Sequence, residues 1–150
     1  MSQVFIGYGK YGIAGVDDEF IRFIFDVTLG STNQLMDSEV GVILADSAEM
    51  QKLNQRYRGK DQPTNVLSFT NQDIVGSPAH TTEDPNYLGD IYVGYEVLIE
   101  EAKNLKVSEQ ERFAQLFVHG LLHLLGFDHE KADETAEMEA LEDKIVQLVL

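Results

Sequence analysis

The chain has 150 residues, of which 43% are hydrophobic, a formal net charge of −15 and no cysteine. This composition predicts one globular domain spanning residues 1–150. It excludes a disordered chain, disulfides and thiolate zinc sites, and the acidic balance argues against broad, sequence-independent binding to nucleic acid. The sequence shows neither a signal-peptide pattern nor an apolar run of roughly 18 residues that could span a membrane, so we expect a cytoplasmic protein with no membrane partner.

Strands and helices alternate in the first sixty residues. They are predicted in order as a strand at 3–8, a helix at 16–30, a buried strand at 39–45 and a helix from 47 to about 59. Gly30 and Gly59 are the expected stops of the two helices, and Asp46 has the spacing of an N-cap to Glu49. The apolar residues expected on the buried faces are Phe20, Phe23, Ile24 and Val27 in the first helix and Met50, Leu53 and Tyr57 in the second.

The second half predicts two further strands and three helices. They are expected as a strand at 64–70, a long loop at 71–87, a strand at 88–94, a helix at 95–106, a helix after residue 108, and a last helix from about 134. Ser108 and Glu111 have capping-box spacing. The last helix is expected to bury Met138, Leu141, Ile145 and Leu148. The fold class is therefore α+β, with a mixed sheet of about four strands packed with about five helices.

Three of the four histidines lie within eleven residues, in the sequence HGLLHLLGFDH. His119 and His123 are four apart, so on a helix both imidazoles share one face. Gly126 can take a positive φ and end the helix, which would let His129 return to the same cleft. Three imidazoles with one open position are the ligand set of a catalytic zinc site, although imidazole also suits copper, nickel and iron. The helix is apolar nearly all round, and no nearby side chain offers the buried imidazoles another partner, which favours a metal over isolated histidines.

Three further residues, two of them inside the histidine motif, need interpretation. Gly120 stands where zinc proteases of the HExxH type carry glutamate, so peptide hydrolysis by that route is disfavoured. The glycine either allows the helix to pack closely against its neighbours or leaves space for a substrate group beside the metal. Asp128 could orient an imidazole or cap the next turn, and His80 is expected to be a solvated loop residue.

Four basic residues fall within nine positions, Lys52, Arg56, Arg58 and Lys60. They fit a local phosphate contact, and they fit equally well a solvated helix end whose cations face the negative end of the helix dipole.

Three segments, residues 57–69, 88–93 and 119–129, resemble the YbeY family of bacterial single-strand-specific endoribonucleases. The resemblance implies a zincin-like fold and one Zn²⁺ held by His119, His123 and His129. It also implies action in 16S ribosomal RNA 3′-end maturation and in ribosome quality control, with ribosomal RNA, small-subunit proteins and assembly factors as partners. Thr70 stands where many members of the family have proline.

The resemblance also implies roles for residues outside the histidine motif. Arg58 matches the family's functional arginine, so the resemblance favours a phosphate contact over a solvated helix end for the basic cluster. It implies that Arg58 and the ligand His119 are catalytic residues. Arg58, Lys60 and Asp90 are the expected substrate-binding residues, although Asp90 also suits a turn or an edge strand. Two alternatives stay open, a metallopeptidase with its base elsewhere and a non-enzymatic ribosome assembly factor with a structural zinc.

Overall fold

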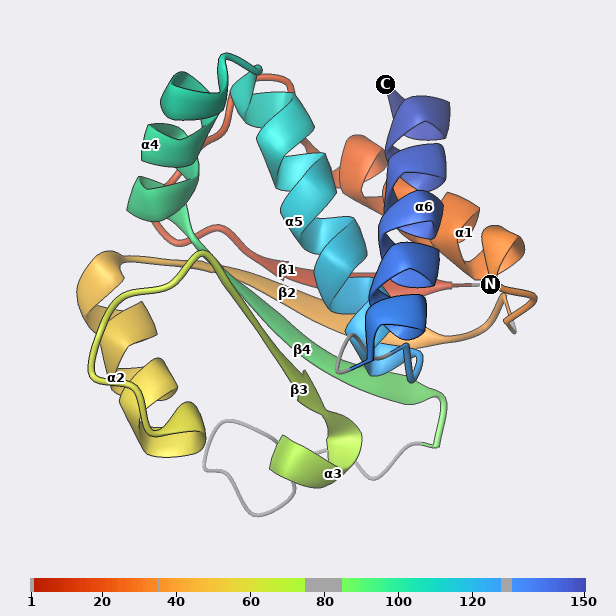
Figure 1. The fold of residues 1–150 in the computed structure, drawn as a ribbon, viewed down its shortest axis with the longest axis horizontal. Helices are drawn as coiled ribbons and strands as arrows, with labels where there is room; N and C mark the ends of the chain where they lie inside the picture. The colour runs from red at the N-terminus through yellow and green to blue at the C-terminus, as the bar shows by residue number, and fades with distance from the viewer. Residues whose placement is uncertain (1, 35, 75–84, 128–130) are drawn as a thin grey trace.

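The computed structural model describes residues 2–34, 36–74, 85–127 and 131–150 (Figure 1). Over these residues the chain forms four strands and six helices. In chain order they are β1 (Gln3–Gly7), α1 (Asp18–Ser31), β2 (Glu39–Ala45), α2 (Ser47–Arg58), β3 (Val66–Thr70), α3 (Asn71–Ile74), β4 (Tyr87–Gly94), α4 (Tyr95–Leu105), α5 (Glu109–Leu124) and α6 (Ala132–Val149). Among the described residues, no helix is both long and apolar enough to cross a membrane.

The strands form one mixed sheet in the order β1-β2-β4-β3. β1, β2 and β4 are parallel, and β3 runs antiparallel to β4 at the edge. Parallel neighbours need a crossover connection, which α1 supplies between β1 and β2. This arrangement confirms the predicted α+β class and the mixed sheet of four strands.

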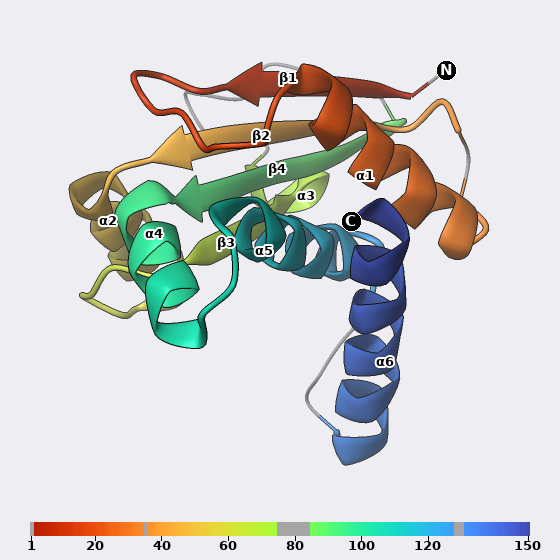
Figure 2. The ribbon, with the colours of Figure 1, turned by 90° about the horizontal axis from the view of Figure 1, so that it is seen from above.

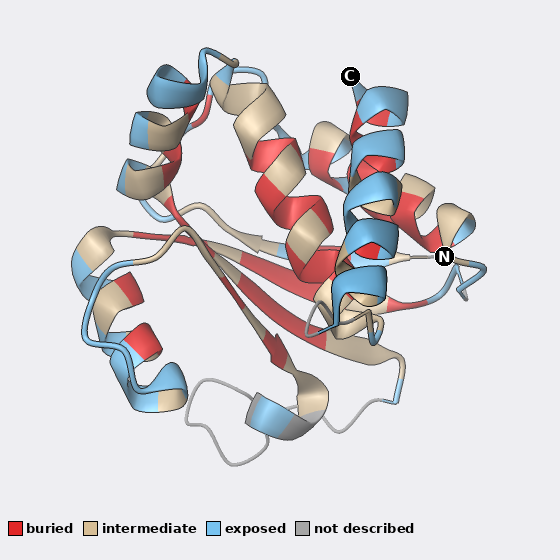
Figure 3. Cartoon of the chain, viewed as in Figure 1, coloured by how far each residue is buried: buried red, intermediate tan, exposed pale blue. Residues whose placement is uncertain are grey.

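The two faces of the sheet carry different layers. Helices α1, α4, α5 and α6 lie on one face, and Figures 1 and 2 show α5 and α6 side by side there. The main core lies between these helices and the sheet (Figure 3). On the opposite face α2 covers a smaller cluster formed by Ala45, Met50, Leu67 and Phe69. The main core therefore fixes α5, the helix that carries the first two histidines of the motif.

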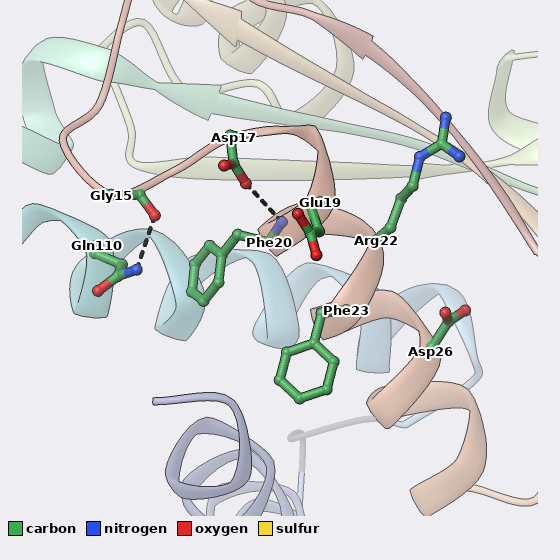
Figure 4. Close-up of a pocket in the computed structure, with 8 residues that line it drawn as sticks. All are labelled: Gly15, Asp17, Glu19, Phe20, Arg22, Phe23, Asp26 and Gln110. Atoms are coloured by element: carbon green, nitrogen blue, oxygen red, sulfur yellow. Dashed lines mark hydrogen bonds between the residues drawn. The ribbon is translucent and has the colours of Figure 1, made fainter.

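The predicted buried face of α1 is correct at Ile24, and Phe20 and Val27 are partly buried against the core, but it is wrong at Phe23. The residues that the helix buries are Ile21, Ile24, Phe25, Thr28 and Leu29. Phe23 is 47% exposed, and together with Phe20 it lines a surface hollow among charged side chains (Figure 4). The helix also continues through Gly30 to Ser31, so the glycine is not its stop. Apolar residues form two adjacent rows along α1, and their spacing alone did not identify which row packs against the core.

The structure changes two other predicted elements. Helix α6 begins at Ala132, and it buries Val146 and Val149 with Met138 and Ile145, whereas Leu148 is 55% exposed. The predicted loop at 71–87 begins with the short helix α3, and residues 75–84, including His80, lie outside the described part of the chain.

Candidate functional site

Helix α5 holds His119 and His123 rigidly at one edge of the core. The helix begins at its cap Ser108, whose Oγ accepts a hydrogen bond from the backbone N of Glu111 at 3.0 Å. Its apolar side is fully enclosed, with Phe113, Phe117 and Leu121 among the residues without solvent exposure. The two histidines lie on the half-buried side, and their Nε2 atoms are 3.1 Å apart. The predicted shared face is therefore present.

The chain turns sharply at Gly126, after the end of α5 at Leu124. Gly126 has φ 93°, and its N–H donates to the carbonyl of His123 at 3.1 Å. The N–H of Phe127 donates to the carbonyl of Leu122 at 3.0 Å, so the helix ends in a Schellman motif, which favours glycine at the left-handed position. This confirms the predicted turn at Gly126. The third predicted ligand, His129, and its neighbour Asp128 lie outside the described residues, so their roles stay predictions.

A carboxylate from α6 contacts the first histidine on the nitrogen that faces away from His123. Oε1 of Glu142 lies 2.5 Å from Nδ1 of His119. The two side chains are 18% and 32% exposed. The expectation that the imidazoles have no side-chain partner is wrong for His119. Glu142 is 23 residues away in the chain and is brought close only by the packing of α6 on α5.

A groove of about 720 Å³ joins the histidines to the basic cluster. Its described lining includes His119, His123, Arg58 and Lys60, together with polar residues of β3 and of the segment before it. Arg58 is the last residue of α2, and its Nη2 donates to the carbonyl of Ser68 at 2.8 Å while its guanidinium lies over the ring of Phe69. The structure therefore brings together four of the six predicted site residues.

The turn after α2 fixes how the two basic side chains enter the groove. Gly59 ends the helix at φ 73°, as predicted, and the N–H of Lys60 donates to the carbonyl of Asn54 at 3.2 Å. The buried side chain of Asn54 donates in turn to the carbonyl of Gln62 at 2.9 Å. Asn54 was not identified from the sequence, because an asparagine within a helix gives no signal of the loop that it anchors.

The position of Gly120 favours the packing interpretation of this residue. A Cβ there would meet Cγ2 of Ile91 at 3.0 Å and Oγ of Ser68 at 3.1 Å. The same hydroxyl donates to the carbonyl of Gly120 at 3.2 Å. The glycine thus lets α5 approach the sheet closely. This contact determines how far His119 and His123 lie from β3.

Asp90 lies on the opposite face of the sheet. Its neighbour Ile91 contacts α5, so the alternation of side chains along β4 points Asp90 away from the histidines. Its carboxylate is buried and accepts a hydrogen bond from the hydroxyl of Tyr87, beside Gly41. Burial, and then this hydrogen bond, raise the pKa of the Tyr87 phenol above its ordinary value. Asp90 is absent from the described lining of the groove, and its expected contact with substrate stays a prediction.

The donor atoms present fit part of a zinc site. Nitrogens that share one tetrahedral zinc ion lie about 3.3 Å apart, close to the 3.1 Å between the two Nε2 atoms. An ionised carboxylate can only accept, so Glu142 requires a hydrogen on Nδ1 of His119, and in the neutral ring Nε2 is then the nitrogen that carries the lone pair. Within the described ranges, no group of three His, Cys, Asp or Glu side chains could hold a metal. The remaining ligand depends on His129.

A family model and the curated relatives of this chain name one family. A family model described as endoribonuclease YbeY matches residues 16–149. The endoribonuclease YbeY of Roseiflexus sp. is 40% identical over 97% of this chain and 89% of its own length. That of Acinetobacter baumannii is 42% identical over 84% of this chain and 79% of its own length. The solution structure of TM1509 from Thermotoga maritima aligns with a TM-score of 0.62 at 28% identity, covering 99% of this chain and 89% of that one.

Proposed function

Because the chain belongs to the endoribonuclease YbeY family, we propose that it is a zinc-dependent endoribonuclease of the cytoplasm that cleaves single-stranded RNA. Its substrate is 16S ribosomal RNA during 3′-end maturation and ribosome quality control. The names of its relatives support RNA cleavage. One geometric observation supports the metal and the phosphodiester chemistry, namely that two converging imidazole nitrogens and two basic side chains share one groove.

His119 and His123 hold the ion through Nε2 in this proposal, with His129 as the third ligand. A zinc ion held there supplies Lewis acidity and lowers the pKa of a coordinated water towards neutrality. The scissile phosphate would bind in the groove, beside His119, His123 and Arg58.

Arg58 stabilises the negative charge that builds on the phosphate. Its hydrogen bonds to the carbonyls of Ser68 and Tyr57 hold the guanidinium over Phe69, which fixes its direction before substrate arrives. A guanidinium has five N–H donors, and these two bonds leave others to pair with the non-bridging oxygens. Lys60, exposed on the same wall, adds a point charge for the RNA backbone. Preorganised donors of this kind contribute more than flexible ones because they need no reorientation during reaction.

The acidic body of the protein supports partners that bring the RNA. A net charge of −15 repels free nucleic acid but attracts basic proteins. Small-subunit ribosomal proteins and assembly factors are therefore the proposed partners, with the groove as the local contact for RNA.

The test combines metal analysis with cleavage of single-stranded and double-stranded RNA. His119→Ala should lose both zinc and cleavage. Arg58→Ala should keep its zinc and lose about 100-fold to 1,000-fold in turnover, the usual cost of one transition-state donor. Arg56→Ala is the matched control, because Arg56 is exposed on the same helix and stacks on Tyr57 outside the groove.

Equal cleavage by the wild type and all variants would show that the activity comes from a contaminant. Full turnover in Arg58→Ala, or cleavage of casein in place of RNA, would also refute the proposal. The second result would favour a metallopeptidase.

A further inference from the structure

Glu142 makes a contact that neither ligand spacing nor core packing requires. It lies on α6, and its Oε1 is 2.5 Å from Nδ1 of His119 on α5. Glu142 lines a surface hollow between α5 and α6 together with Arg112 and His119. The next residue, Asp143, lines this hollow too but is exposed, so a carboxylate on this turn of α6 can also remain in solvent. The apolar residues Met138, Ile145, Val146 and Val149 already provide the buried face of α6.

The basic side chain of this hollow, Arg112, is paired with other residues. Nε and Nη2 of Arg112 donate to Oε1 of Glu101 at 3.0 and 2.8 Å, and its Nη1 donates to Gln115 at 2.7 Å. Glu142 therefore interacts with the imidazole and is not drawn towards the guanidinium. His119 lines both this hollow, which contains Glu142, and the groove, which contains Arg58 and Lys60.

We propose that Glu142 is a positioning residue that prepares His119 for metal binding. Its carboxylate accepts the hydrogen of Nδ1, which holds the ring in one orientation and leaves Nε2 as the metal-binding nitrogen. Carboxylates placed in this way also raise the basicity of the ligand, and their loss weakens metal affinity about 10-fold to 100-fold. This inference rests on the proposed function, because it assumes that His119 is a metal ligand.

The first test measures zinc affinity by competition with a chromophoric chelator. Glu142→Ala should lose about 10-fold to 100-fold in affinity. Glu142→Gln should lose less, because its amide oxygen still accepts from Nδ1 but has no charge. Asp143→Asn is the matched control and should bind like the wild type, since it removes one negative charge from the adjacent position without touching His119. Thermal unfolding of the zinc-free proteins checks that each variant is folded.

A second readout reports the hydrogen directly. Nitrogen-15 spectra of the zinc-free protein, in mildly alkaline buffer, should show His119 with its hydrogen on Nδ1. Glu142→Ala should shift the ring towards the tautomer with the hydrogen on Nε2, whereas Asp143→Asn should leave it unchanged. A residue that only supported the packing of α6 would not change this tautomer.

The outcomes separate the inference from the function on which it rests. If His119→Ala binds zinc as tightly as the wild type, the metal site itself is wrong. If His119→Ala loses zinc while both Glu142 variants match Asp143→Asn, the metal site stands and the positioning role of Glu142 is refuted. Equal losses in the Glu142 variants and Asp143→Asn would also refute it, because they would indicate a general effect of charge.

Discussion

Gly89 is the residue at which a single methyl group should damage the fold most. Its φ is 147°, a region that other residues rarely adopt, and an added Cβ would lie 2.1 Å from the carbonyl oxygen of Phe69 on the paired strand β3. Backbone strain of this kind costs about 1–3 kcal/mol, and forced overpacking costs a similar amount. We expect Gly89→Ala to lower the free energy of unfolding by about 3 kcal/mol or more, measured by urea denaturation.

Gly30→Ala is the control for this substitution. Gly30 is exposed within α1, and an added Cβ would meet no atom within 4 Å. Alanine is the better helix former, so the free energy of unfolding should rise by about 0.5–1 kcal/mol. Equal effects of the two substitutions would show that β3 and β4 are not as close at Gly89 as the structure places them.

At the residue scale, the sequence predicted the local parts of the site but not the parts that other elements supply. His119, His123 and Gly126 are linked by helical spacing and turn chemistry, which are readable within eight residues. Glu142 reaches the site only through the crossing of two helices, and nothing in its own surroundings distinguishes it from the other acidic residues of α6. The third ligand His129, also predicted from spacing, stays a prediction.

At the scale of one element, the N-cap of α5 should stabilise the helix without affecting the metal site. Oγ of Ser108 accepts from the N–H of Glu111, and the cap lies eleven residues, about 16 Å, before His119. Ser108→Ala should cost about 0.5–2 kcal/mol of unfolding free energy in the zinc-free protein. The zinc affinity of the folded variant should be unchanged. Ser108→Asn should restore stability, and a loss as large as that of alanine would show that the hydroxyl does not act as a cap.

The bounds of the elements were more predictable than the faces that they bury. Residues 39–45 form a strand as expected, and the cap Asp46 and the stop Gly59 hold α2 in place. These signals are local, because they depend on propensity and on backbone hydrogen bonds near each end. Phe23 and Leu148 were predicted to be buried but are exposed, since the rotation of α1 and α6 is decided by the helices and strands opposite them.

At the scale of the molecule, the strand order joins segments that no local pattern connects. β4 lies between β2 and β3, which leaves β3 at the edge of the sheet. Ser68 of this edge strand accepts a hydrogen bond from Arg58 at its carbonyl and donates one from its hydroxyl to Gly120 of α5. The sequence predicted the number of strands and their mixture of directions but not this order. The groove between the histidines and the basic cluster therefore could be expected from the family resemblance, but not from the periodicity of either segment.

The described lining of the groove holds two cations, Arg58 and Lys60, and the carboxylate of Asp73, on a molecule with a net charge of −15. Affinity for single-stranded RNA falls with salt by a slope of about 0.7 per neutralised phosphate, so each cation in the groove should contribute one such increment. Lys60→Ala should weaken the binding of a short single-stranded RNA to the zinc-free protein and reduce the salt slope by about 0.7, measured by fluorescence anisotropy at several salt concentrations. Lys52→Ala should change neither value, because Lys52 is an exposed lysine of α2 outside the described lining of the groove. Equal effects of the two substitutions would mean that RNA senses the overall charge of the protein and not a contact at Lys60, which would remove the groove from the proposed path of the substrate.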